Sequence, residues 1–162
     1  MKVGVLSDTH IATQDAAVAF AQKLMSGPFA EVDVIIHAGD LVYPELDSCF
    51  YPVPWYGVRG NMDAAQDTLP DKRILSLADK KIGMVHGWGS PRGIETRVLE
   101  FFSGFRLDVL VFGHSHWPVC RKVDQLLLFN PGSPTDRRAA PYHTVGILEL
   151  GADVTGEIIR ID

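Results

Sequence analysis

The stretch "VDVIIHAGD", residues 32–40, decides the fold class of this chain. It is a near-continuous apolar run that ends at Gly39 and Asp40. Such runs are typical of strands that are buried on both faces of a parallel sheet. The runs "KVGVLS" (residues 2–7) and "VPWYGVRG" (53–60) predict two further strands of the same kind.

A helix is expected between the first two strands. The stretch "TQDAAVAFAQKLMSG", residues 13–27, has helical patterning, with Thr13 as the expected N-cap and Gly27-Pro28 as the stop. The order strand, helix, strand indicates an α/β fold with a parallel sheet.

The second half of the chain has a different pattern. Two apolar runs flank the polar turn at residues 78–81 and predict a hairpin, and a helix (93–105) then leads into the strand "LDVLVFG" (107–113). Short apolar runs in the tail predict strands of a second, largely antiparallel sheet packed on the first: 118–123, 126–130, 144–150 and 154–161. With 162 residues and no repeat or linker, we expect a single domain, residues 1–162.

Composition and charge exclude several functional classes. The net charge of −5 provides no basic surface for nucleic acid, which disfavours long nucleic acid as a partner. The first apolar run stops at Asp8, too early for a signal peptide or a membrane span, and no later run is long enough, so we expect no membrane partner. Cys49 and Cys120 lack any framework spacing, which favours a reducing compartment and predicts a cytoplasmic protein.

Polar residues follow the predicted strands directly. If these strands run in a common direction, their carboxyl ends meet along one edge of the sheet, where open α/β sheets bind ligands. A single histidine in such a loop is usually a hydrogen-bonded residue without a functional role. Five motifs with the same placement favour a functional site. The motifs are DTH, GD, GNMD, HG and GHSH, and they supply seven candidate ligands: Asp8, His10, Asp40, Asn61, His86, His114 and His116.

This set of donors predicts a pair of divalent metal ions. Two carboxylates, four imidazoles and one amide, without a thiolate, suit Mn²⁺, Fe²⁺, Co²⁺, Ni²⁺ or Zn²⁺. Seven side chains are too many for one ion that must also admit a substrate. Two ions carry four positive charges and the two aspartates remove two, so 4 − 2 leaves about +2, which attracts phosphate. Two such ions can also hold a bridging hydroxide that attacks phosphorus.

In their order along the chain, these motifs resemble the calcineurin-like metallophosphoesterase family. The stretch "NPGSP" (130–134) is similar to its small, single-domain phosphodiesterase branch. The resemblance implies an α/β fold of two mixed β-sheets, packed as a sandwich and flanked by helices in four layers. It also implies a binuclear site, with manganese as the expected metal and nickel, iron, cobalt or zinc as alternatives.

The resemblance assigns each ligand to an ion. One metal would be bound by Asp8, His10, Asp40 and His116. The other would be bound by Asp40, Asn61, His86 and His114, with Asp40 as the bridge. Asp40, Asn61 and His86 are the expected catalytic residues. The residues expected to bind substrate are Asn61, Arg59, Asn130 and Ser133.

Met62 departs from the family pattern. The family motif is usually GNHD, and its histidine protonates the leaving group, which a thioether cannot do. Either another donor takes this role or the enzyme is limited to good leaving groups, unless Met62 only fills a gap in its loop. Further arginines are candidates for contacts with phosphate oxygens, although most surface arginines have no such role: Arg92, Arg137 and Arg138.

Other polar and aromatic residues have less specific signals. His37 is expected to be a packed core histidine or a support for a ligand, and His143 a surface or strand-start residue. Asp63 either anchors the GNMD loop or is a simple turn carboxylate. Three aromatic residues flank the motif loops, where they could stack a base or pack the core: Trp55, Tyr56 and Trp88.

Three functions are therefore considered. The leading hypothesis is a binuclear, metal-dependent phosphodiesterase that acts on a small phosphoester. The alternative is a protein-interaction scaffold, because the same fold resembles the retromer subunit Vps29, although a pure scaffold has no physical need for seven intact ligands. A nuclease for long nucleic acid is disfavoured by the acidic charge. The native metal, the substrate and a possible homo-oligomer stay open.

Overall fold

The computed structural model describes residues 1–64 and 68–162, and within these ranges the chain forms two five-stranded sheets and two α-helices. The first sheet has the order β10-β9-β1-β2-β3, and the second has the order β4-β5-β6-β8-β7. The elements are β1 (Lys2–Leu6), α1 (Gln14–Met25), β2 (Val34–His37), the 3₁₀ helix η1 (Leu46–Phe50), β3 (Trp55–Gly57), β4 (Lys72–Leu77), β5 (Lys80–Val85), α2 (Ile94–Phe101), β6 (Val109–Val111), β7 (Val119–Val123), β8 (Leu126–Asn130), β9 (Thr144–Leu150) and β10 (Val154–Arg160).

The predicted strand, helix, strand unit is confirmed in the first sheet. β1 and β2 run parallel, with Val3 opposite Val34, and β3 runs parallel to β2 on its other side. The helix between them begins at the predicted N-cap, where the Thr13 hydroxyl accepts a hydrogen bond from the Ala16 N–H at 3.4 Å. The short helix η1 was not predicted from the sequence.

The prediction for the tail strands is wrong in part. β7 and β8 join the second sheet with the predicted hairpin β4–β5, but β9 pairs antiparallel with β1 in the first sheet, and β10 pairs antiparallel with β9. The tail therefore divides between both sheets. The first sheet is mixed because β9 runs antiparallel to β1 while β1 and β2 are parallel. The second is mixed, and not largely antiparallel as predicted, because β5, β6 and β8 run parallel to one another. Two mixed sheets are what the family resemblance implied.

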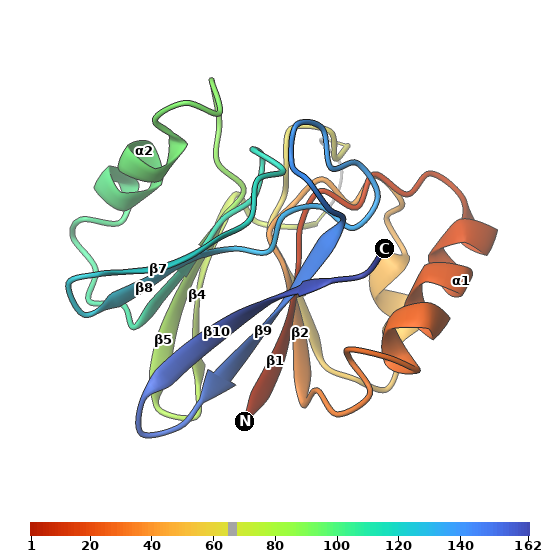
Figure 1. Cartoon of the computed structure of the whole chain (residues 1–162), viewed down its shortest axis with the longest axis horizontal. Coiled ribbons are helices and arrows are strands. Elements are labelled where there is room, and N and C mark those ends of the chain that lie inside the picture. The colour runs from red at the N-terminus through yellow and green to blue at the C-terminus, as the bar shows by residue number, and fades with distance from the viewer. Residues whose placement is uncertain (65–67) are drawn as a thin grey trace.

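Alternating side chains pack the sheets face to face. Val3 and Val5 of β1 point into the core between the sheets, whereas Leu6 faces α1. α1 covers the outer face of the first sheet, and α2 covers the outer face of the second through Val98 and its neighbours. Figure 1 shows the resulting four layers, with α1 and α2 on opposite sides of the sandwich.

The strands that precede the polar motifs end together. In Figure 1, β1, β2 and β5 have their carboxyl ends at the upper end of the sandwich. β3 runs parallel to β2, and β6 runs parallel to β5, so their carboxyl ends lie at the same end. We expected these ends along one edge of one sheet, but they meet across the junction between the two sheets. Among residues 1–64 and 68–162, we find no helix with the length and apolar character to cross a membrane.

Candidate metal centre

The first sheet supplies four of the predicted ligands. Asp8 and His10 follow β1, Asp40 follows β2, and Asn61 lies in the loop after β3. Both aspartates are almost completely buried, at 0% and 1% exposure, which is rare for carboxylates that have no charged partner.

The second sheet supplies the other three ligands. His86 follows β5, and His114 and His116 follow β6, so that their loops meet the loops of the first sheet at the junction. His116 and His86 are buried, whereas His114 is partly exposed. The structure thus brings all seven predicted side chains to one place, from five strands of two sheets.

The first group of donors is built around His116. Its Nε2 lies 3.3 Å from Asp8 Oδ1 and 3.3 Å from His10 Nε2. Asp40 Oδ2 lies 3.8 Å from the same His10 nitrogen. These are the four residues that the resemblance assigns to one metal ion.

The second group is built around His86 and Asn61. His86 Nε2 lies 3.3 Å from Asp40 Oδ2 and 3.1 Å from Asn61 Oδ1. His114 Nδ1 lies 2.9 Å from the same Asn61 oxygen. Asp8 Oδ1 also lies 3.9 Å from His86 Nε2, so both aspartates, and not Asp40 alone, stand between the two groups.

Backbone carbonyls fix the orientation of three of these histidines. In each ring, one nitrogen faces the other ligands and the other, here called the remote nitrogen, faces away from them. The remote nitrogen of His86 (Nδ1) lies 2.7 Å from the Ala38 oxygen, and that of His114 (Nε2) lies 2.7 Å from the Gly89 oxygen. His116 makes the same type of contact with the carbonyl of Asp136. A carbonyl only accepts, so each remote nitrogen carries the proton.

In a neutral ring, this tautomer leaves the inner nitrogen as a hydrogen-bond acceptor. The neutral forms of His86 and His114 turn lone pairs toward Asn61 Oδ1, which is an acceptor too. Converging acceptors repel unless a cation lies among them, and hydrogen bonds to the remote nitrogen are the usual second contact of metal-ligating histidines.

The backbone at the ligands is strained. Residues other than glycine rarely adopt positive φ, and such residues gather at functional sites where the surrounding structure holds them. Five of the seven ligands have this conformation: Asp8 (φ 53°), His10 (45°), Asp40 (61°), His114 (66°) and His116 (58°).

The motif glycines allow the ligand loops to approach one another. A Cβ on Gly60 would lie 2.2 Å from Asp40 Oδ1, and a Cβ on Gly113 would lie 1.8 Å from the Ser7 hydroxyl oxygen. Both positions therefore require glycine because carboxylate or hydroxyl oxygens occupy the space of a side chain.

Electrostatics favours positive charge between the two aspartates. Burial acts to raise the pKa of Asp8, but the contacts with His116 and His86 outweigh it and hold this pKa below its ordinary value. Burial likewise acts to lower the pKa of His86, but Asp40 and Asp8 outweigh it and raise that pKa. Two buried carboxylates that stay ionised are suited to hold a cation, whether a proton or a metal ion.

Asp63 and His37 support the ligand loops. Asp63 accepts three backbone N–H bonds, from Asp40 (2.9 Å), Val42 (2.9 Å) and Gly60 (2.8 Å), which favours the anchoring role over that of a simple turn residue. His37 is fully buried, and its Nδ1 accepts the Gly39 N–H at 3.1 Å. It is a core residue that shapes the turn before Asp40.

Asn130 and Ser133 differ from the expectation that they contact substrate. Both are completely buried, and their polar atoms form hydrogen bonds within the protein. Asn130 donates to the Gly113 oxygen at 3.0 Å, and Ser133 donates to the Asp8 oxygen at 2.7 Å. Their arrangement holds the loops of His114 and Asp8 in place and presents neither side chain to a substrate.

Sequence reasoning missed several supporting residues, among them Ser7 and Asp136. The Ser7 hydroxyl donates to Asp8 Oδ2 at 2.6 Å, and Asp136 accepts from His116 through its carbonyl. Ser7 precedes a motif directly, so its position was a usable signal. Asp136 lies in an irregular loop 20 residues after His116, where no sequence pattern marks it.

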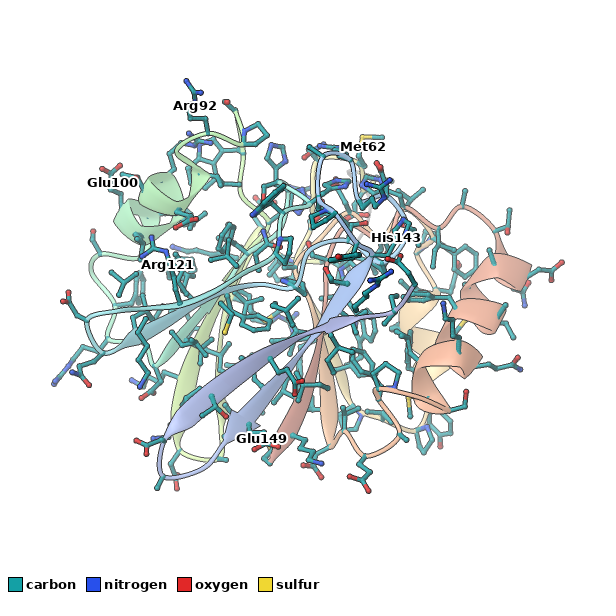
Figure 2. All side chains as sticks on the ribbon, in the orientation of Figure 1. Met62, Arg92, Glu100, Arg121, His143 and Glu149 are labelled. Carbon is teal, nitrogen blue, oxygen red and sulfur yellow. The ribbon has the colours of Figure 1, made fainter. Side chains whose placement is uncertain are left out.

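The candidate arginines lie in different places. Arg59 pairs with Asp71 at the rim of the centre, whereas Arg137 donates to the Ala140 oxygen and Arg138 pairs with Asp136. Figure 2 shows Arg92 on the loop before α2, with its side chain directed outward.

Met62 stands at the surface beside the ligands. Its backbone N–H donates to Asp40 Oδ1 at 2.7 Å, but its side chain is 57% exposed and projects outward in Figure 2. It does not fill a gap in the loop. His143, away from the centre, pairs with Asp162 at 2.6 Å just before β9, as expected for a strand-start residue.

Comparisons with known proteins agree with this geometry. Residues 1–153 match the family model described as a calcineurin-like phosphoesterase superfamily domain. A protein of Methanothermobacter thermautotrophicus named probable metallophosphoesterase is 36% identical, over 99% of this chain and 92% of its own.

Solved structures share the fold. An archaeal phosphodiesterase superposes with a TM-score of 0.74 at 22% identity, over 98% of this chain and 100% of its own. Vps29 from Entamoeba histolytica, solved in complex with Zn²⁺, superposes with a TM-score of 0.70 at 22% identity, over 100% of both chains. The match of the family model over almost the whole length, with the assembled ligand set, shows that the chain belongs to the calcineurin-like phosphoesterase superfamily.

Proposed function

We propose that this protein is a phosphodiesterase that holds two divalent metal ions and hydrolyses a small phosphoester. Membership of a metal-dependent family supports the general class. One observation carries the metal assignment: His86, His114 and His116 each give their remote nitrogen to a backbone carbonyl and turn the other nitrogen toward the carboxylates and Asn61.

Each group of donors would hold one ion. His10 and His116 would bind the first, and Asn61, His86 and His114 the second, while Asp40 and Asp8 lie close to both groups. Two bound ions would polarise a phosphoryl oxygen and lower the pKa of bound water, so that hydroxide would be available as the nucleophile at neutral pH. Manganese is the proposed metal, and nickel, iron, cobalt and zinc suit the same donors.

The protein's own contribution is to hold charge and geometry. Asp8 and Asp40 stay ionised, and the carbonyl contacts keep the histidine rings fixed, so the ligands need little rearrangement when the ions or substrate bind. Asn61 and Arg59 lie at the rim, where a phosphoester would meet them, and we propose both as substrate contacts.

A diester is favoured over a monoester because of its charge, and an ester with a good leaving group is favoured because of Met62. A diester carries one negative charge and a monoester about two, so attack by an anion is easier on the diester. Met62 supplies no proton to a leaving group, which suits esters whose leaving group departs as a stable anion. We further propose a cytoplasmic location, in keeping with two cysteines that form no disulfide with each other.

Metal content and kinetics test the proposal together. The protein is reconstituted with Mn²⁺, its metal content is measured, and hydrolysis of bis-p-nitrophenyl phosphate is compared with that of p-nitrophenyl phosphate. We expect two ions per chain, a preference for the diester, and loss of both ions and activity in Asp40→Ala. Asp153→Ala, an exposed aspartate, is the control. One ion or none in the wild type, or preference for the monoester, would count against the proposal.

The alternative is a scaffold similar to Vps29. A solved Vps29 structure holds Zn²⁺, so intact ligands alone do not separate the two functions. Turnover does: a scaffold would bind metal with the same stoichiometry and hydrolyse none of the diesters above the rate of free Mn²⁺.

A further inference from the structure

A cavity of about 550 Å³ opens directly beside the second group of ligands. Asn61 and His86 form one wall of it, so a molecule in the cavity would touch residues of the metal centre. This volume lies in the range of small-molecule sites, which is roughly 300–1,000 Å³.

Two aromatic side chains also line the cavity. Trp88 and Phe101 line the cavity with side chains that are 43% and 41% exposed, and their rings meet edge to face with centroids 5.3 Å apart. The buried side chain of Val85 contributes further apolar surface. Large exposed aromatic rings beside a polar centre suit a ligand with an apolar, flat part.

The loop that carries Trp88 is held in place from two sides. Arg97 of α2 donates to the Trp88 carbonyl from Nε at 3.0 Å and from Nη2 at 2.8 Å. The next residue, Gly89, accepts from His114 Nε2 at 2.7 Å. The backbone of Trp88 is therefore tied both to α2 and to a metal ligand, and its position is set before any ligand binds.

The other candidate aromatic residues are used elsewhere. Trp55 stacks on His37 with centroids 5.5 Å apart and packs against the first sheet, and Tyr56 packs against the core beneath Arg73. Trp117 is 50% exposed but lines a separate cavity of about 330 Å³.

The charged side chains around the cavity bear on the kind of ligand that it suits. Arg59 and Asp71 line the cavity and pair with each other at its polar side. The Asp63 carboxylate also lines it, and Lys72 Nζ lies 4.8 Å from the centroid of the Phe101 ring, so these four formal charges cancel. The apolar surface of Trp88, Phe101 and Val85 therefore characterises the cavity, and it suits an uncharged ring.

We propose that this cavity binds an uncharged, flat aromatic substituent of the phosphoester, with Trp88 as the stacking surface. The inference rests on the proposed function, because it places the phosphorus atom at the metal centre. Two sources share this chemistry, an aryl group and a nucleobase. Trp88 is a specificity residue in this view and takes no part in the reaction itself.

Binding measurements on the Mn²⁺-loaded protein test the inference in two matched pairs. Phenylphosphonate is compared with methylphosphonate, and thymidine 5′-phosphate with 2-deoxyribose 5-phosphate, by calorimetry. We expect the aromatic member to bind about tenfold more tightly, as for stacking of one base. This advantage should disappear in Trp88→Ala and be largely kept in Trp88→Phe.

Controls separate the cavity from the metal centre. Trp117→Ala should keep the full aromatic advantage, and all variants should keep the metal content and the affinity for methylphosphonate of the wild type. An advantage in only one pair assigns the site to aryl or to nucleoside esters. Equal binding within both pairs, or an advantage that survives Trp88→Ala, overturns the inference. Absence of diester hydrolysis in the wild type instead contradicts the proposed function.

Discussion

Left-handed backbone occurs at both ends of the sandwich, with different causes. At the lower end, Ala78 and Asp79 (φ 47° and 62°) form the two-residue turn of the exposed β4–β5 hairpin. At the upper end, Asp8 and Asp40 (φ 53° and 61°) have the same conformation but are buried. The hairpin sets its own geometry through a short turn, whereas the ligands depend on residues far along the chain.

The difference teaches where strain is functional. An L-residue in the left-handed region costs about 1–2 kcal/mol. In the hairpin, this cost is removable because glycine serves the turn equally well. At the metal centre, the residues that carry the strain are the ligands themselves, so relaxing the backbone removes the donors.

Disturbing the ligand loops at the upper end of the sandwich, called the ligand end below, should have the largest effect. Gly60→Ala does this without removing a ligand. The new Cβ would lie 2.2 Å from Asp40 Oδ1, so the carboxylate must move. We expect kcat/KM for bis-p-nitrophenyl phosphate to fall at least about 100-fold, because small misplacements of catalytic groups have effects of this size.

Gly104→Ala is the matched control, since a Cβ there meets no atom within 4 Å. It should keep both activity and metal content. If Gly60→Ala retained wild-type kinetics at full metal occupancy, the close packing of the ligand loops would have no catalytic role.

Met62→His tests whether the ligand end lacks a proton donor. The exposed side chain at position 62 leaves room for an imidazole, and the backbone N–H to Asp40 is kept. A positioned general acid is worth about 10²–10⁴-fold for leaving groups that need a proton. We expect at least about a tenfold rise in kcat/KM for an alkyl diester and little change for a nitrophenyl diester, at matched metal content. Equal changes for both esters would reject a missing acid.

His37 makes the stability of the folded protein depend on pH. Burial lowers its pKa from 6.5 to about 4, and the Gly39 N–H, which donates to Nδ1, also requires the neutral ring. As pH falls from 6.5 toward 4, the unfolded chain binds a proton that the folded chain does not, so stability decreases, by at most about 1.4 kcal/mol per pH unit.

The test compares metal-free wild type with His37→Gln in urea. Glutamine does not titrate, so the wild-type advantage in unfolding free energy should shrink between pH 6.5 and about 4 and stay constant above this range. A pH-independent difference would show that His37 titrates alike in both states.

A substitution in the β4–β5 hairpin at the lower end should have the smallest effect, and it should stabilise the protein. Asp79→Gly removes the unfavourable φ of 62° in an exposed turn. We expect the free energy of unfolding to rise by a few tenths to about 1 kcal/mol, with unchanged kcat/KM. A loss of activity here would mean that the two ends are coupled through β5, which leads from this turn to His86.

Local patterns made most of the fold predictable. The β1-α1-β2 unit and the β4–β5 hairpin follow from apolar runs, a threonine cap and a polar turn, all of which act over short distances. The partition of the tail was not predictable, because β9 pairs with β1 and Lys2 lies opposite Glu149, far along the chain. Strand propensity identifies a strand but not its partner.

The centre was predictable to the level of its donors. All seven candidate ligands converge, because strand ends collect polar residues in parallel sheets. The supports were less visible: Gly89 and Asp136 act through main-chain carbonyls, which any residue could provide. The burial of Asn130 and Ser133 likewise depends on loop packing that no local pattern encodes.

The position of the centre across the junction of the sheets ties ion affinity to the integrity of the whole sandwich. Asp8 and Asp40 belong to one sheet and His86 and His116 to the other, so neither sheet alone carries a complete donor group. By mass action, any ion that binds only the closed arrangement disfavours separation of the sheets. Metal occupancy therefore reports on the packing of the two sheets against each other. A substitution of Val5 or Val111 in the core between the sheets would alter retention of the ions without contacting a ligand.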